Sequence, residues 1–361
     1  MGRKRLLYIL HNVQIGGVEV ALLSAIPDLN RKYDLRVLAL GRVDDQIISN
    51  LTEDEKSVFY SFDFKPYLYP FRVTQLLNFI ADFNPDLMIC SLWRASLLGT
   101  IAKQFHKKIC FVSFIHSSGF AHALDRFFSV LAISKADKIL TDSEATSKFV
   151  TSNFLPKAPV HVISFCTNPS PDQNLIAPLN PHEIRLLFLG RLNKVKNLTL
   201  TVEAIADLRS RNMNVTLDIY GKDDGERSIL EKQIEALALN DFVHFKGEVY
   251  AAEKLKIFKQ YNFLIQLSSR EGMAMSVAEA MQHGLVCIVT PVGEIPNYAT
   301  DMETAIFIDV SNKEKWEQSL DKVERVIHVD GIYEQISSAC YEKFKHVKTY
   351  SDSLIDELET L

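Results

Sequence analysis

The sequence predicts an α/β protein built from two doubly wound domains with parallel sheets. Two observations carry this prediction. Short, fully apolar runs alternate with longer amphipathic stretches, and the alternation stops once, at a proline-rich segment, before it resumes. Apolar runs of this kind are typical of parallel strands that helices cover on both faces. A length of 361 residues fits two domains.

In the first half of the chain, each apolar run predicts a strand and each amphipathic stretch a helix. The first run, RLLYILH, is followed by a stretch with helical periodicity, and this pattern recurs up to the proline-rich segment. The predicted strands cover residues 5–11, 33–40, 57–62, 86–92, 108–115, 136–141 and 160–163, and the predicted helices cover residues 17–29 and 72–83.

The proline-rich segment, Phe165–Glu183, predicts an interdomain linker. It carries four prolines among polar residues, which exclude a helix or a central strand. We therefore expect a first domain over residues 1–165, a linker over 166–183 and a second domain over 184–361.

The alternation of strands and helices then restarts. The predicted strands cover residues 184–189, 215–220, 243–245, 263–267, 286–290 and 305–308, and the predicted helices cover 197–210, 226–239 and 274–282. Helices are also expected after Asn312, and packing of these helices back on the first domain is an open option. Ligands of doubly wound sheets bind at the carboxyl ends of the strands, so the site is expected in a cleft between the domains.

Composition narrows the class of protein. Apolar residues make up 47% and charged residues 24%, which excludes a largely disordered chain. The 40 basic and 45 acidic residues give a net charge of −5, which speaks against a nucleic-acid binder. The five cysteines lack metal-ligand spacing, and no secretory signal or membrane-spanning run is evident. We therefore expect a cytoplasmic protein.

The charge is unevenly distributed along the chain. Residues 1–170 carry 19 Lys and Arg against 15 Asp and Glu, whereas the remaining residues carry 21 against 30. The net charges are thus +4 and −9. A basic first half makes an anionic membrane surface a candidate partner, with peripheral attachment at the inner face of the membrane, although on charge alone chance scatter is the preferred explanation.

The segment SSREGMAMSVAEAMQHG, residues 268–284, is the most informative motif. Glu271 lies in the loop after a predicted strand, and the helix that follows offers free amides near Ala274, Met275 and Ser276 to a phosphate. Glu279 lies farther along this helix, where its carboxylate could bind the hydroxyls of a ribose. Because apolar residues flank it, we expect the helix to be mostly buried and the carboxylate to need a partner.

Other candidate residues follow predicted strands in both domains. Gly16 and Gly17 let the backbone approach an anion at the start of a helix. Arg191 and Lys196 could clamp a diphosphate with a guanidinium fork and a point charge, although a solvated loop would carry such residues too. His116 ends a predicted strand of the first domain, where a catalytic and a structural role are equally plausible.

These motifs, in this order, resemble family 4 of the retaining glycosyltransferases. The resemblance rests on IGGVE at residues 15–19, the Gly-Arg…Lys loop at 190–196, the strand and turn at 243–249, and two glutamates with seven residues between them. It implies the GT-B fold, in which two Rossmann-like domains face each other across a cleft. Met273 and Met275 depart from the family pattern, which points to a reshaped sugar pocket.

The resemblance also implies roles for the site residues. Arg191 and Lys196 would neutralise the diphosphate of a nucleotide sugar, and amides of residues 274–276 would bind phosphate. The expected base of this donor is uridine. Glu279 would hold the ribose and Glu271 the donor sugar. The turn at Gly247 and Val249 would receive the base, and Gly16, Gly17 and His116 would face the sugar.

The predicted activity is transfer of a hexosyl or N-acetylhexosaminyl group, without a metal, to a saccharide or lipid-linked saccharide. The expected catalytic residues are Glu271, His116, Arg191 and Lys196. A nucleotide-sugar epimerase and a non-catalytic scaffold on the same fold remain alternatives.

Overall fold

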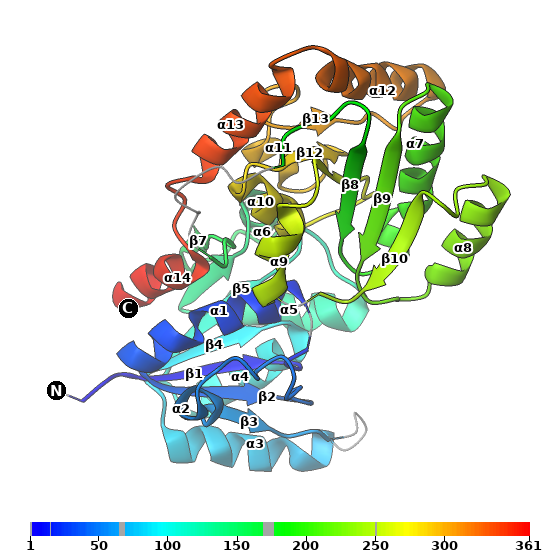
Figure 1. The fold of residues 1–361 in the computed structure, drawn as a ribbon. Coiled ribbons are helices and arrows are strands. Elements are labelled where there is room, and N and C mark those ends of the chain that lie inside the picture. Colours follow the sequence, from blue (N-terminus) through cyan, green and yellow to red (C-terminus); the bar gives the residue numbers. More distant parts are fainter. Residues whose placement is uncertain (1, 15, 65–68, 169–176, 250) are drawn as a thin grey trace. The chain divides into compact units, whose positions relative to one another are not determined.

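The computed structural model describes residues 2–14, 16–64, 69–168, 177–249 and 251–361. The chain divides into two compact units. Unit 1 consists of Met1–Asn168 together with Lys348–Leu361, and unit 2 consists of Pro169–Val347. The last part of the chain therefore belongs to the first unit (Figure 1). Among the helices that are described, none has the length and apolar character needed to cross a membrane.

The sheet of unit 1 has seven strands in the order β3-β2-β1-β4-β5-β6-β7, and all neighbouring strands that pair are parallel. This order changes direction between β1 and β4, as doubly wound sheets do. The strands are β1 (Arg5–Leu10), β2 (Asp34–Ala39), β3 (Phe59–Ser61), β4 (Leu87–Ser91), β5 (Cys110–Ile115), β6 (Lys138–Thr141) and β7 (Val160–Val162).

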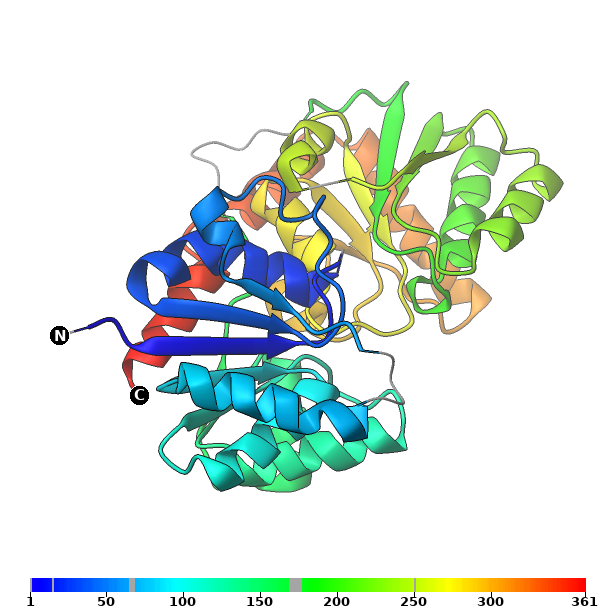
Figure 2. The ribbon, with the colours of Figure 1, turned by 90° about the horizontal axis from the view of Figure 1, so that it is seen from below.

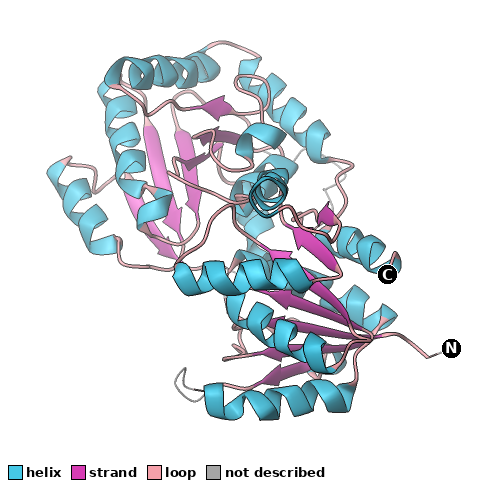
Figure 3. Cartoon of the chain, turned by 180° about the vertical axis from the view of Figure 1, so that it is seen from behind, coloured by secondary structure: helices cyan, strands magenta, loops and turns pink. Residues whose placement is uncertain are grey.

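Helices cover both faces of this sheet (Figures 2 and 3). Leu7 and Ile9 of β1 pack in one core with residues of α3, α4 and α5. On the other face, α1 packs against α14. Of these helices, α1 and α3 were predicted with bounds, and α14 lies in the stretch after Asn312 where helices were expected without bounds. They are α1 (Gly17–Lys32), α2 (Glu53–Lys56), α3 (Tyr69–Phe83), α4 (Trp93–Phe105), α5 (Ala123–Lys135), α6 (Glu144–Phe154) and α14 (Tyr350–Glu359).

Unit 2 repeats this architecture with six parallel strands in the order β10-β9-β8-β11-β12-β13. The order again changes direction, between β8 and β11, so the loops after these two strands lie at the switch point where ligands bind in such sheets. The strands are β8 (Ile184–Leu189), β9 (Val215–Tyr220), β10 (Val243–Gly247), β11 (Phe263–Gln266), β12 (Val286–Val289) and β13 (Ile306–Phe307).

The helices of unit 2 pack on one large core that includes strand residues and residues of α7, α8, α12 and α13. They are α7 (Leu198–Ser210), α8 (Arg227–Ala236), α9 (Ala251–Phe258), α10 (Met275–Gln282), α11 (Ile295–Tyr298), α12 (Lys313–His328) and α13 (Ile332–Phe344), with a 3-10 turn, η2 (Lys194–Lys196), before α7.

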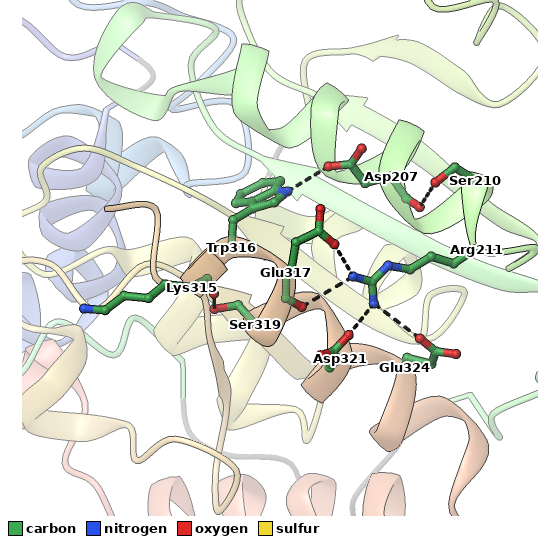
Figure 4. Close-up of polar contacts among 9 residues, drawn as sticks. All are labelled: Asp207, Ser210, Arg211, Lys315, Trp316, Glu317, Ser319, Asp321 and Glu324. Carbon is green, nitrogen blue, oxygen red and sulfur yellow. Dashed lines mark hydrogen bonds and ion pairs between the residues drawn. The ribbon is translucent and has the colours of Figure 1, made fainter. Parts of the chain in front are cut away.

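A polar cluster ties the end of α7 to α12 (Figure 4). The Arg211 guanidinium donates to carboxylates of Glu317 at 2.5 Å, Asp321 at 2.7 Å and Glu324 at 3.3 Å. Its side chain is 19% exposed, so these bonds are partly shielded from water. Since all three carboxylates come from one face of α12, the cluster fixes the position of this helix.

Candidate active site

The candidate site of unit 2 is built where the loops after β8, β11 and β12 meet. The backbone N–H of Ser269 donates to the carbonyl of Val195 at 2.9 Å, which joins the first two loops. The N–H of Glu294 donates to the carbonyl of Gly272 at 3.0 Å, which joins the loop after β12 to that of Glu271. These bonds hold residues from distant parts of the sequence in one place.

Lys196 and Glu271 form an ion pair at this junction. The Lys196 ammonium donates to Glu271 Oε1 at 2.7 Å, and the two side chains are 18% and 9% exposed. The local sequence places the lysine, because Asn193 accepts from the Lys196 N–H and so caps η2. A pair this well shielded is strongly coupled, since removing one partner leaves a charge that water solvates poorly.

A glycine in the loop after β12 shapes the backbone around Glu271. Gly293 has a φ of +62°, a left-handed conformation that favours glycine. A Cβ there would also collide with the carbonyl oxygen of Glu271 and would lie 2.7 Å from that of Gly272. The loop that carries Glu271 can therefore close on this site only because residue 293 has no side chain.

A buried glutamine, not singled out in the sequence, bonds to the same carboxylate. Gln266 ends β11, is fully buried, and donates through Nε2 to Glu271 Oε1 at 2.9 Å. Its Oε1 accepts from the Ser276 hydroxyl at 2.7 Å. The signal in the sequence was one polar residue within the apolar run at residues 263–267.

The helix α10 begins at this site. Ala274, at its N-cap, is left-handed with a φ of 53° and makes no side-chain cap bond. The first-turn amides of an α-helix have no partner within the helix, so those of Met275 and Ser276 suit an anion. Glu279, farther along, is 5% exposed and accepts from the Lys254 ammonium of α9 at 2.7 Å. The expected burial and the expected need for a partner are both confirmed.

Arg191 lies apart from the Lys196 ion pair. Its guanidinium is 3.7 Å from the carboxylate of Asp224, and both side chains are more than half exposed. An ion pair this open contributes little, so it is easily given up to a stronger anion. The neighbouring Asp223 accepts from the backbone N–H groups of residues 225, 226 and 227, and these bonds lower the pKa of its carboxyl.

The turn expected to receive the base follows β10. Gly247 has a φ of +84°, and a Cβ built on it would meet no atom within 4 Å. Its carbonyl accepts from the Gly221 N–H at 2.8 Å. Val249 is half-buried. The turn is thus open at its glycine, which leaves room for a flat ring.

In unit 1, the predicted glycines precede and open α1. Gly16 is the N-cap of this helix, and its carbonyl accepts from the Val20 N–H at 2.9 Å. Its φ of −160° is open to any residue. The atoms nearest to a Cβ built on Gly16 belong to the carboxylate of Glu19, the end of a flexible side chain that can move away. Gly17 begins the helix, and Ile15 of the same motif lies outside the described residues.

His116 follows β5 and is held by a chain of hydroxyl groups. Its Nε2 lies 3.1 Å from Ser91 Oγ, which is 2.7 Å from the Tyr8 hydroxyl. The Tyr350 hydroxyl of α14 lies 3.3 Å from that of Tyr8. Burial lowers the pKa of His116 to about 3, so the imidazole is neutral at physiological pH. Its Nδ1 is buried and has no partner among the described residues.

A second histidine at this edge of the sheet was missed from the sequence. His11 follows β1, and its Nε2 accepts from the Arg94 N–H at 2.9 Å. Burial, with a contribution from Arg94, lowers its pKa to about 3. Its ring meets Trp93 edge to face at 5.8 Å, and Trp93 stacks on Phe128. The signal was the position of His11 at the end of the strand predicted over residues 5–11.

Within the described ranges, no group of three or more His, Cys, Asp or Glu residues is arranged to hold a metal ion. The positive charge at the unit 2 site comes from lysine and arginine side chains and from helix amides.

Comparison with solved structures shows the GT-B fold. HepE of Anabaena, solved in complex with UDP-glucose, has a TM-score of 0.79 and 19% identity, and the match covers 99% of this chain and 100% of that one. Sucrose-phosphate synthase of Thermosynechococcus elongatus also has a TM-score of 0.79, with 14% identity over 99% of this chain and 98% of that one.

Curated relatives are glycosyltransferases. A D-inositol 3-phosphate glycosyltransferase of Paenarthrobacter aurescens is 27% identical over 146 residues, which are 40% of this chain and only 36% of that protein. An uncharacterized glycosyltransferase of Methanocaldococcus jannaschii is 24% identical over 292 residues, which are 74% of each chain.

Two family models match, one after the other. The model described as Glycosyltransferase Family 4 matches residues 15–170, and the model described as Glycosyl transferases group 1 matches residues 173–338. Together they span both units up to α13. The chain belongs to family 4 of the glycosyltransferases, the group 1 transferases with the GT-B fold.

Proposed function

We propose that the protein is a retaining glycosyltransferase that moves a hexosyl or N-acetylhexosaminyl group from a nucleotide diphosphate sugar to a hydroxyl of a saccharide or lipid-linked saccharide. Polysaccharide or glycolipid biosynthesis is the process that such a reaction serves. The observation that carries the proposal is the shielded pair of Lys196 and Glu271 beside the first turn of α10. It sets a cation, a carboxylate and helix amides around one point.

This arrangement suits the departure of a nucleoside diphosphate. When the bond between the sugar C1 and the diphosphate breaks, negative charge develops on the leaving oxygen and positive charge on the sugar. Preorganised donors aimed at the leaving group lower that barrier, typically by a few kcal/mol each. Lys196, with Arg191 swung from Asp224, and the amides of Met275 and Ser276 are the donors in this proposal, which needs no metal.

Retention follows if the acceptor attacks the face that the diphosphate leaves. The acceptor oxygen then forms a bond to C1 while the bond from C1 to the phosphate oxygen breaks. The proton of the acceptor hydroxyl passes to the departing phosphate, so no side-chain base is required. In this scheme Glu271 accepts from a hydroxyl of the donor sugar, Glu279 binds the ribose, and neutral His116 exchanges a hydrogen bond with the sugar.

Uridine is the proposed base, held at the turn of Gly247 and Val249. HepE was solved with UDP-glucose, and a relative from Streptococcus pneumoniae, 32% identical over 103 residues, is named a UDP-N-acetylglucosamine–peptide N-acetylglucosaminyltransferase subunit. A relative from Xanthomonas oryzae, 26% identical over 181 residues, is named for GDP-mannose. A test of the base must therefore include guanosine donors.

The test is a thermal-shift panel of UDP-glucose, UDP-galactose, UDP-N-acetylglucosamine, GDP-mannose, UDP and GDP. A ligand that binds only the folded state raises the stability by about 2.7 kcal/mol at a hundredfold excess over its Kd. We expect a UDP-sugar to stabilise the wild type and Lys194→Met, an exposed lysine of the same loop, and to stabilise Lys196→Met far less. No shift with any nucleotide would favour the non-catalytic scaffold.

Turnover distinguishes the remaining alternative. A transferase consumes the donor and releases UDP only in the presence of a saccharide acceptor, apart from slow hydrolysis, and its product has the anomeric configuration of the donor. An epimerase on the same fold would convert the donor without an acceptor. Both results can be read by NMR of the reaction mixture.

Attachment to an anionic membrane surface is proposed for unit 1. Its helix α5 exposes Leu124 and Phe127, which are 57% and 62% accessible, with the exposed Arg126 between them. Cosedimentation with vesicles tests this. We expect binding to vesicles with anionic lipid to exceed that to neutral vesicles at low salt, and Leu124→Asp with Phe127→Asp to abolish it. Leu237→Asp, on exposed apolar surface of unit 2, is the control.

A further inference from the structure

We propose that Gln266 is a positioning residue that turns the Glu271 carboxylate so that one oxygen, Oε2, is presented to a hydroxyl of the donor sugar. The inference rests on the proposed function and deepens it. It predicts that Gln266 governs the recognition of the sugar and leaves recognition of the nucleotide unchanged.

The side-chain amide of Gln266 is buried and held by two hydrogen bonds. Gln266 is fully buried at the end of β11, a strand whose four residues are all buried. A primary amide in such surroundings is costly unless it is hydrogen-bonded. Gln266 meets this requirement with one bond to Glu271 at 2.9 Å and one to Ser276 at 2.7 Å. The amide therefore has a fixed direction.

Donor and acceptor are fixed in both hydrogen bonds of the Gln266 amide. A carboxylate accepts only, so the amide nitrogen of Gln266 must face Glu271 and the amide oxygen must face Ser276. The Ser276 hydroxyl is then the donor to Gln266. Its proton is committed, so the contribution of Ser276 to a phosphate comes from its backbone N–H. The chain of bonds thus links the first turn of α10 to Glu271.

The two oxygens of the Glu271 carboxylate differ in their hydrogen bonds. Lys196 Nζ and Gln266 Nε2 both donate to Glu271 Oε1, at 2.7 and 2.9 Å. Among the described residues, none bonds to Oε2. Two donors on one oxygen fix the plane of the carboxylate, because rotating it would break both bonds. Oε2 keeps its capacity to accept, which is what a sugar hydroxyl needs.

The first experiment separates sugar from nucleotide. Gln266→Leu keeps the approximate volume of the side chain and removes both bonds. We expect the Kd for UDP to stay within about twofold of the wild type, while kcat/KM for the UDP-sugar falls about ten- to a hundredfold, as for the loss of a bond to a charged group. Gln260→Leu, at an exposed glutamine after α9, is the matched control and should change neither value.

The second experiment uses pH. Gln266→Glu places a second carboxyl against Glu271, and two carboxyl groups this close raise the pKa of one of them. At high pH both are charged, and Glu271 loses a donor. At low pH one proton enters the pair, and the substituted carboxyl donates in place of the amide. We expect kcat/KM relative to the wild type to rise at least fivefold from pH 8 to pH 5.5.

A packing role alone gives different results. If Gln266→Leu weakens UDP and the UDP-sugar equally, or leaves kcat/KM within twofold of the wild type, the inference is wrong, and a ratio for Gln266→Glu that is independent of pH also overturns it. Failure of the wild type to bind UDP or to transfer sugar would instead remove the proposed function, and the inference with it. UDP binding by each variant reports that unit 2 is folded.

Discussion

Each unit holds a candidate catalytic side chain with a buried chain of polar groups, but the two chains end differently. In unit 1 hydroxyl groups of Tyr350, Tyr8 and Ser91 lead to His116, which is neutral. In unit 2 the chain ends in a charged pair, and it consists of Ser276, Gln266, Glu271 and Lys196.

The carboxyl ends of the strands thus serve a different purpose in each unit. A neutral chain orients a group that exchanges hydrogen bonds, and it tolerates the loss of one member, since no charge is left unpaired. A chain that ends in charges sets an electrostatic field, and it depends most on its two charged members, because removing either one leaves a poorly solvated charge. Single substitutions in the two chains and beside Glu279 test this contrast.

Lys196→Met should have the largest effect. It removes a donor to the leaving group and leaves the Glu271 carboxylate without its cation, so kcat/KM should fall by about a hundredfold to a thousandfold. Steady-state kinetics with the donor identified by thermal shift checks this. Lys194→Met, two residues earlier and exposed, should stay within twofold. A similar loss in both variants would show that the charge of the whole loop matters, rather than the ion pair.

Lys254→Met should have the next largest effect. Lys254 donates to Glu279, the residue proposed to bind the ribose, and Glu279 is 5% exposed. Without the cation the carboxylate is less well oriented, and we expect the Kd for UDP to rise about tenfold, equivalent to about 1.4 kcal/mol. Isothermal titration measures it, and Lys256→Met, exposed on the same helix, is the control. An unchanged Kd would assign the pair a structural role.

We expect His116 to make the free energy of unfolding depend on pH. Its pKa is about 3 in the folded state, below the ordinary value of about 6.5 for an unfolded chain. Between these pH values the unfolded state binds a proton that the folded state does not bind. The contribution of His116 to the free energy of unfolding is therefore present in full above about pH 6.5 and is lost as the pH falls toward 3.

His116→Asn should therefore reduce the loss of stability between pH 7.5 and 5.5 by up to about 1.4 kcal/mol. Urea unfolding at the two pH values tests this, with His346→Asn, an exposed histidine, as control. His11, whose pKa is also about 3, should still contribute its own loss. If the free energy of unfolding falls by the same amount in His116→Asn and in the wild type, His116 is not buried in its neutral form.

Tyr350→Phe should have the smallest effect. The two hydroxyls of Tyr350 and Tyr8 are 3.3 Å apart, a long bond, and Tyr8 keeps its bond to Ser91. We expect a loss of about 0.5 kcal/mol in unfolding free energy and kcat within twofold of the wild type. A large drop in kcat would contradict the tolerance inferred for the neutral chain.

The sequence was sufficient for the fold where burial alone decides the structure. The strands β8 and β9 begin and end at the predicted residues, because both are short apolar runs bounded by turns. Glu279 was correctly expected to be buried and partnered, because the residues around it on α10 are apolar. Local pattern carries this kind of information.

Partners from distant segments could not be predicted. Gln266, Glu271 and Ser276 lie within eleven positions of one another, yet their bonds depend on how β11 meets α10. Lys254 reaches Glu279 from α9, and nothing in its neighbours along the chain indicates this. Arg191 and Lys196 were expected at one diphosphate, and the carboxylates that they contact in the structure, Asp224 and Glu271, were not predicted as their partners.

The helix α14 bears on how the chain acquires its shape during synthesis. Tyr350 is fully buried in unit 1 and meets Tyr8, 342 positions earlier in the sequence. All residues of unit 2 are made before this helix leaves the ribosome. A nascent chain thus has its second α/β unit in full while the first still lacks a helix that packs beside α1. Contacts so distant in sequence form late, and the surface that α14 covers remains open to chaperones until this helix arrives.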